Sequence, residues 1–192
     1  KMIQKTLYTI KKILFFFKLD INKYNKLNSP HTFLNHLFKN QNIDTVIDLG
    51  AHTGEYHNMI RNLGFKNLVA CIEPQKEISQ IIKAKTKSYL NTIIFPKLAI
   101  FNKNSQKKIF IYENTFTSSL KKSVKKKHKS SYLVKCITLD NLLKKNIFKK
   151  KNSIFLKIDT QGSEFEILKQ SKLLKEKIDY LQIEVSIINL YE

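Results

Sequence analysis

The sequence predicts an α/β protein with a doubly wound, mostly parallel sheet, and three observations support this fold class. The 192 residues suffice for one domain with a substantial core, since a chain of this size buries roughly 70% of its unfolded surface. From residue 43 onward, short apolar runs alternate with amphipathic stretches of helical length, a pattern typical of strands that helices cover on both faces. Only four Gly, three Pro and two Cys are present, which excludes collagen-like, disordered and disulfide-rich proteins.

The first forty residues predict a helical extension that precedes this domain. Residues 1–20 place apolar side chains at helical spacing with lysines between them. Their longest apolar run, at 13–17, is far shorter than the roughly 20 residues of a membrane span. We expect a helix that packs on the domain, and a helix on an anionic membrane surface is the alternative. A second helix is expected at 30–40, so the extension covers 1–40 and the domain 41–192.

The rest of the chain predicts strands joined by helices. Ligands of doubly wound sheets bind beyond the carboxyl ends of the strands, where the strand order reverses. Functional residues are therefore expected directly after the strands. Right-handed crossovers are expected between parallel strands. The expected helices are at 55–63 and 75–85. The expected strands are at 45–49, 67–72, 92–101, 108–112, 133–139, 154–158 and 179–185.

A glycine-containing loop follows the first expected strand. It contains Gly50 and Gly54, two of the four glycines. A strand that turns sharply into a helix over a ligand needs positive φ or a backbone without Cβ, and the helix start then offers free N–H groups. After the second strand comes Glu73, some twenty residues further on, where a carboxylate can accept hydrogen bonds from both ribose hydroxyls. Together these features predict a nucleoside-binding first half.

The loop differs from that of a dinucleotide-binding protein. The position of the middle glycine in Gly-x-Gly-x-x-Gly, which lets the backbone approach a pyrophosphate, is occupied by His52. Asp48 also directs a carboxylate into the expected pocket. These two residues disfavour a diphosphate and favour a cofactor with positive charge, such as S-adenosylmethionine.

Several motifs resemble those of the FkbM-type methyltransferases. They occur in the order DLGAHTGEY, IEP, KLAI, SSL, ITLDNLL, LKIDTQGSEFEIL and IEVS, between residues 44 and 191. The resemblance implies the Rossmann-like fold of class I S-adenosylmethionine-dependent methyltransferases and O-methylation, often of sugars or polyketide-like products. In that fold two more strands follow the one that ends in IEVS, so we expect a sheet that lacks the last two strands. The implied cofactor residues are Asp48, Gly50, Ala51, Gly54 and Glu73, and His52, where the family usually has Asn, is expected to line the cofactor.

A sugar hydroxyl is a poor nucleophile and needs a base or a metal to take up its proton. Asp159 directly follows the expected strand at 154–158, and Glu164 lies one helical turn further on. Either carboxylate could be the catalytic base. The alternatives are a helix cap for Asp159 and a first-turn residue stabilised by the helix dipole for Glu164. Lys157 could offset the repulsion between them or bind an acidic substrate.

Other polar residues are candidates for the substrate side. Ser118 and Ser119 could bond a polar substrate or begin a helix. Asp140 could take a substrate-side role, as the resemblance suggests, or form part of a strand-to-helix cap. Glu184 could face the pocket or pair with a lysine. No Cys, His or carboxylate cluster has metal-site spacing, so no metal is expected.

The composition bears on partners and location. The chain carries 35 Lys and Arg against 15 Asp and Glu, but only Arg61 is arginine. Arginine is the residue that bidentate phosphate recognition prefers, so we expect a solvated lysine-rich surface and a small-molecule or glycan acceptor. A basic RNA-binding module and a membrane-surface-associated non-catalytic domain are the alternatives. Cys71 and Cys136 lie in apolar runs, which predicts buried thiols and a cytoplasmic protein, with a peripheral position at the inner membrane face left open.

Overall fold

The computed structural model describes residues 10, 14, 29–149, 151, 153–186, 188, 190 and 191. Nearly all of the helix predicted at 1–20 lies outside the described residues. The chain divides into two units, residues 1–37 and 38–192. The predicted helix at 30–40 is present as α2 (Pro30–Asn40). Within the described residues, no helix has the length and apolar character needed to cross a membrane.

The larger unit contains a five-stranded parallel sheet in the order β3-β2-β1-β7-β8. The chain moves outward from β1 to β3 and then returns to the other side of β1 with β7 and β8. The strand order therefore reverses between β1 and β7, as in doubly wound folds. In the described part of the chain, β8 is the last strand of this sheet. The strands are β1 (Thr45–Leu49), β2 (Leu68–Glu73), β3 (Thr92–Pro96), β7 (Ile154–Ile158) and β8 (Tyr180–Ile183).

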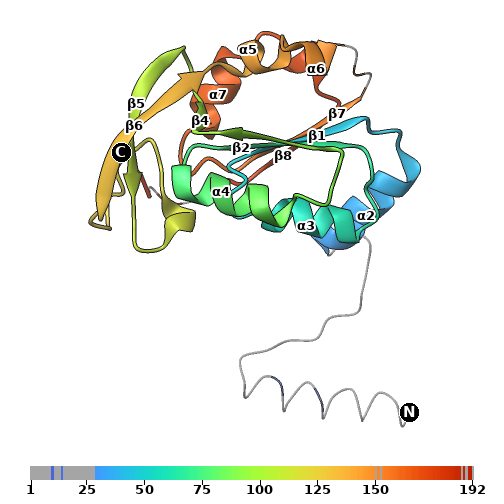
Figure 1. Ribbon diagram of the computed structural model, residues 1–192, viewed down its shortest axis with the longest axis horizontal. Helices are drawn as coiled ribbons and strands as arrows, with labels where there is room; N and C mark the ends of the chain where they lie inside the picture. Colours follow the sequence, from blue (N-terminus) through green and yellow to red (C-terminus); the bar gives the residue numbers. More distant parts are fainter. Residues whose placement is uncertain are drawn as a thin grey trace. The chain divides into compact units, whose positions relative to one another are not determined.

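Helices cover both faces of this sheet, with α3 and α4 on one side and α5, α6 and α7 on the other (Figure 1). All residues of β1 and β7 are buried, which explains why both strands are nearly continuous apolar runs. Leu142 and Phe148 pack on the sheet from the second helical layer. The helices are α3 (Glu55–Asn62), α4 (Lys76–Lys85), α5 (Leu139–Leu143), α6 (Asn146–Lys149), α7 (Glu164–Gln170) and α8 (Leu174–Lys177).

A second, three-stranded sheet has the order β4-β6-β5 and its own core, which includes Ile109 and Val134. Its strands are β4 (Leu98–Ile100), β5 (Ser105–Ile111) and β6 (Ser130–Ile137), and the 3-10 helix η1 (Thr115–Thr117) lies between β5 and β6. The prediction of one strand at 92–101 was wrong. Lys97 has a φ of 54°, which turns the chain out of the first sheet after β3 and into the second as β4.

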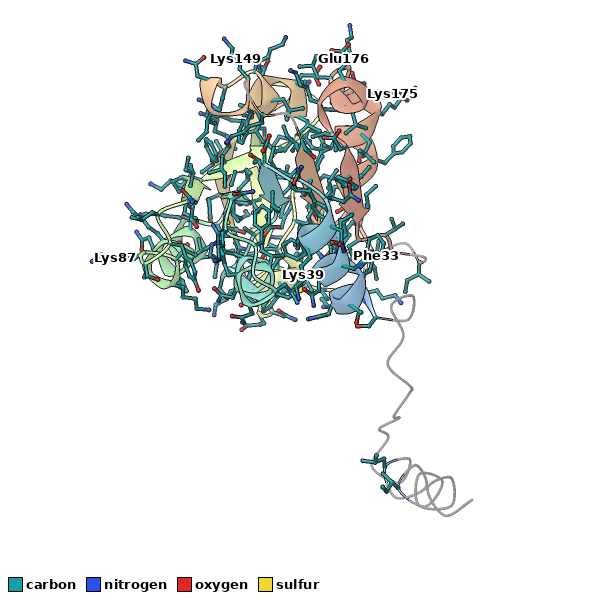
Figure 2. The ribbon with its side chains drawn as sticks, turned by 90° about the vertical axis from the view of Figure 1, so that its right-hand side faces the viewer. Phe33, Lys39, Lys87, Lys149, Lys175 and Glu176 are labelled. Carbon is teal, nitrogen blue, oxygen red and sulfur yellow. The ribbon has the colours of Figure 1, made fainter. Side chains whose placement is uncertain are left out.

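The lysines contribute mainly to the surface. Lys87, Lys149 and Lys175 are exposed and project from the helical layers (Figure 2). Cys71 and Cys136 are both buried free thiols, as predicted. The high lysine content therefore leaves the apolar core of the larger unit intact.

Candidate functional site

The glycine turn lies between the carboxyl ends of β2 and β7. Gly50 and Gly54 have φ of 82° and 88°. The N–H groups of Gly50 and Ala51 donate to Ile72 O, at 3.0 and 3.1 Å. A Cβ on Gly50 would collide with the carbonyl oxygen of Asp159. Glycine is therefore required at position 50 both by its φ and by the close approach of the chain after β7.

The carboxylate of Glu73 points toward this turn from the end of β2. Glu73 Oε2 accepts a hydrogen bond from His52 N and Oε1 accepts one from Gln75 N, both at 2.8 Å. The side chain is almost completely enclosed, with 2% of Glu73 exposed. Burial raises the pKa of Glu73 to about 7, against the opposing effect of these hydrogen bonds. Its predicted place beside the glycine turn is thus the place that the structure gives it.

A row of three polar residues, two of them buried, crosses the sheet one step before the strand ends. Asp48, Lys157 and Gln182 are register neighbours on β1, β7 and β8. Lys157 Nζ lies 3.0 Å from Asp48 Oδ1 and 3.4 Å from Asp159 Oδ2. Tyr56 covers the row from α3, with its hydroxyl donating to Gln182 Oε1 at 2.8 Å and its ring 5.1 Å from Lys157 Nζ.

The charges in this row depend on each other. Burial raises the pKa of Asp48, and this effect outweighs the opposing effect of Lys157. Burial acts to lower the pKa of Lys157, but Asp48 and Asp159 together outweigh it and raise that pKa. Lys157 is therefore a cation held between two carboxylates, and only 9% of the residue is exposed. Its predicted contact with substrate remains a prediction.

The two predicted catalytic carboxylates have different surroundings. Glu164 Oε1 accepts hydrogen bonds from Thr160 N and Oγ1, at 2.8 and 2.9 Å, and Oε2 accepts one from Gly162 N at 2.9 Å. Through these hydrogen bonds, Glu164 stabilises the turn between β7 and α7. Asp159 accepts a hydrogen bond from Gln161 Nε2 at 2.7 Å and lies 3.4 Å from Lys157 Nζ. Of the two, Asp159 is the better placed to serve as a base, and this role remains a prediction.

Glu184 lies next to Asp159 because its N–H continues the register of β8 against β7 and donates to Ile158 O at 3.0 Å. The charge of Asp159 and, second, burial raise the pKa of Glu184. At the carboxyl ends of β7 and β8, the carboxylates of Asp159 and Glu184 thus lie close together, near Lys157. In the described part of the chain, no group of three or more His, Cys, Asp or Glu side chains could hold a metal ion.

The predicted substrate-side residues separate into two groups. Ser119 is buried, and its Oγ donates to Gln161 O at 2.5 Å. Ser118 Oγ is buried and has no hydrogen-bond partner among the described residues. Both serines thus lie near the turn that follows β7, and Ser119 helps to hold it.

Asp140 lies elsewhere. It accepts hydrogen bonds from Ser171 Oγ, Lys172 N and Leu173 N at 2.7, 3.1 and 3.2 Å. These three residues follow the last turn of α7, whereas Glu164 begins that helix. The expected place of Asp140 beside the substrate is therefore corrected: its carboxylate fastens α5 to the segment between α7 and α8.

Sequence reasoning missed the segment that covers the glycine turn. His52 Nε2 and Thr115 Oγ1 share a hydrogen bond of 2.9 Å, and the His52 ring stacks on Phe116 with 3.7 Å between centroids. Gln75 Nε2 donates to Thr115 O at 3.2 Å. Burial lowers the pKa of His52, which favours the neutral ring in this stack. These contacts join positions at least 40 residues apart, so no local pattern could have indicated them.

A further missed residue is Tyr191. Its Oη lies 2.8 Å from Gln161 Oε1 and 3.2 Å from Thr117 O. Its ring packs against Gly162, where a Cβ would come within 2.9 Å of it. Tyr191 therefore connects the turn after β7 with η1.

These groups fit a cofactor that combines a nucleoside with a positive charge. Asp48 Oδ2 is buried without a hydrogen-bond partner among the described residues, so it can take a further donor or a nearby cation. A carboxylate offers about four acceptor positions, and Glu73 uses two of them on backbone N–H groups. The remaining positions suit ribose hydroxyls.

Comparison with known proteins finds a family that matches most of the chain. Residues 48–192 match the model of the methyltransferase FkbM domain. The comparison with curated proteins found no match. A solved structure described as a candidate RNA methyltransferase from Pyrococcus horikoshii has 24% sequence identity and a TM-score of 0.29, and the likeness covers 48% of this chain. This chain spans 58% of the length of that structure.

Proposed function

Because the chain belongs to the FkbM methyltransferase family, we propose that it is an S-adenosylmethionine-dependent enzyme that methylates a hydroxyl oxygen of a sugar or a related metabolite. The observation that carries this proposal is the Glu73 carboxylate, buried at the end of β2 and directed at the Gly50–Gly54 turn. The reversal of strand order between β1 and β7 supports it, because this is where doubly wound sheets bind ligands.

The residues near the turn would hold the cofactor. Glu73 would accept hydrogen bonds from the ribose, and Asp48 would place negative charge near the positively charged part. The loop of Gly50, Ala51, His52 and Gly54 would provide the surface against which the cofactor lies. When bound, S-adenosylmethionine supplies an electrophilic methyl group on a sulfonium.

The residues at the end of β7 would act on the acceptor. Asp159 would take up the hydroxyl proton as the acceptor oxygen attacks, which is the task of a general base. Lys157 Nζ, 3.4 Å from Asp159 Oδ2, would hold this carboxylate in position. Ser118 Oγ, buried without a partner among the described residues, is available to bond a polar group of the acceptor.

Calorimetric titration with S-adenosylhomocysteine tests the cofactor site. We expect saturable binding to the unmodified chain. In Glu73→Gln the affinity should fall about 10- to 100-fold, the effect of losing one charged hydrogen-bond acceptor of roughly 1.5–3 kcal/mol. Glu77→Gln is the matched control, because Glu77 is exposed in the first turn of α4 and its replacement should leave binding unchanged. Equal binding by Glu73→Gln and the unmodified chain would contradict the proposed site.

The acceptor is tested by methyl transfer from labelled S-adenosylmethionine to a panel of free sugars, sugar phosphates, glycans and RNA. We expect label in a carbohydrate fraction and, in Asp159→Asn, a loss of transfer with cofactor binding retained. Label in RNA alone would refute a carbohydrate acceptor.

A further inference from the structure

We propose that residues 114–118, which include η1, form a movable cover over the cofactor site, and that Phe116 holds this cover shut by stacking on His52. The inference rests on the proposed function, because it concerns access to the Glu73 carboxylate. It adds Phe116 and Thr115 to the residues that determine how the cofactor enters.

The cover is attached to both residues that flank Glu73. His52, whose N–H donates to Glu73 Oε2, holds Thr115 by a hydrogen bond and Phe116 by ring stacking. Gln75, whose N–H donates to Glu73 Oε1, holds the carbonyl of Thr115 through its side chain. The same short segment thus connects the two sides of the carboxylate.

In this arrangement the carboxylate is inaccessible. Only 2% of Glu73 is exposed, while two ribose hydroxyls would need direct contact with its oxygens. The backbone donors His52 N and Gln75 N lie in the turns that follow β1 and β2, and they hold the carboxylate in place. The cover is the part that can leave without disturbing the sheet, so cofactor entry requires it to move.

The cover is built to move. None of the residues of η1 is buried, and Phe116 is 53% exposed in spite of its stack. The chain is fixed on either side, because Tyr112 and Ser119 are each 2% exposed. A short, lightly packed segment between two fixed points has a low opening free energy, as in the loops that close over other active sites.

The test uses a unique fluorophore. The chain contains no Trp, so the indole introduced by Phe116→Trp reports on the cover alone. We expect titration of this variant with S-adenosylhomocysteine to change its indole emission saturably, with the same midpoint as the calorimetric titration. Leu90→Trp is the control. Leu90 is 97% exposed and lies at the amino end of β3, whereas Glu73 lies at the carboxyl end of β2. The emission of that variant should therefore stay constant.

Stopped-flow association gives the second readout. In Phe116→Ala the ring stack on His52 is lost. The association rate of S-adenosylhomocysteine should therefore rise, by about tenfold if the closed form dominates. Phe116→Leu, which keeps part of the packing, should give an intermediate rate. Heat of binding seen only after Phe116→Ala would also support the cover.

Two results would overturn the inference in distinguishable ways. Heat of binding with constant indole emission in Phe116→Trp and unchanged association in Phe116→Ala would refute the cover and leave the proposed function standing. Absence of binding in all these folded variants would refute the proposed function, and the cover would fall with it.

Discussion

The ionisation of Glu73 affects stability as well as binding. Burial raises its pKa from an ordinary value of 4.5 to about 7, so between these values the folded chain binds a proton that the unfolded chain has lost. The stabilisation of the folded state by protonated Glu73 is therefore fully present below about pH 4.5. It is lost as the pH rises toward and through 7.

We expect the free energy of unfolding to fall by up to about 3 kcal/mol over this range because of Glu73 alone. Urea unfolding at a series of pH values measures it. Glu73→Gln, which cannot titrate, should lack this part of the pH dependence. The same slope in both chains would show that Glu73 has an ordinary pKa.

Arg61, unlike Glu73, has a role that is visible only in the fold. Its guanidinium donates to the carbonyls of Phe65, Asn67 and Asn91 at 2.9, 2.8 and 2.7 Å. It also lies 5.4 Å from the ring of Tyr89. One planar side chain thus ties α3 to the segments before β2 and β3, a task that the single ammonium group of lysine cannot perform.

Arg61→Lys should therefore lower the free energy of unfolding by about 2–4 kcal/mol, the range for losing one or two charged hydrogen bonds. Lys87→Gln, a change of an exposed lysine, should have an effect below about 0.5 kcal/mol. Urea unfolding of both variants checks this. A similar small effect in both would show that the Arg61 contacts contribute little.

At the scale of elements, the turn after β1 depends on the turn after β7. Gly50 and Gly64 both have positive φ, but a Cβ at Gly50 would overlap the Asp159 carbonyl, whereas a Cβ at Gly64 meets nothing within 4 Å. Comparing alanine at the two positions separates backbone strain from crowding.

Gly64→Ala should cost about 1–2 kcal/mol, the cost of a left-handed conformation. Gly50→Ala should cost at least about 2 kcal/mol more, because β1 and β7 must also separate. Thermal unfolding measures the difference, and calorimetry should show that only Gly50→Ala loses S-adenosylhomocysteine binding. Equal losses of stability in Gly50→Ala and Gly64→Ala would mean that the turns after β1 and β7 do not constrain each other.

The elements also show what the sequence could predict. The strands β1, β2 and β7 were predictable because burial on both faces demands continuous apolar runs, and the places of Gly50 and Glu73 follow from the strand ends. The break at Lys97 was not, because the chain changes sheets within one apolar run. The three hydrogen bonds that Glu164 accepts could not be predicted, because they come from a turn whose geometry the sequence does not display.

At the scale of the whole molecule, some parts of the candidate site could be predicted from the sequence and others could not. The residues of the proposed cofactor side, from Asp48 to Glu73, come from one stretch of the sequence, so their closeness at the ends of β1 and β2 could be predicted. The cover at 114–118 belongs to the connection between two strands of the smaller sheet, and Tyr191 comes from the last residues of the chain. Their contacts depend on tertiary packing, which a single sequence leaves undetermined.

The pairing of β1 has a consequence for how the protein is made. On one side β1 pairs with β2, but on the other it pairs with β7, where Thr45 meets Ile154. A ribosome that adds roughly 5–20 residues per second needs on the order of 5–20 s to produce the intervening ~100 residues. During that time one border of β1, a strand that is buried along its whole length in the folded protein, has no native neighbour, so we expect the nascent chain to need chaperones that shield such segments.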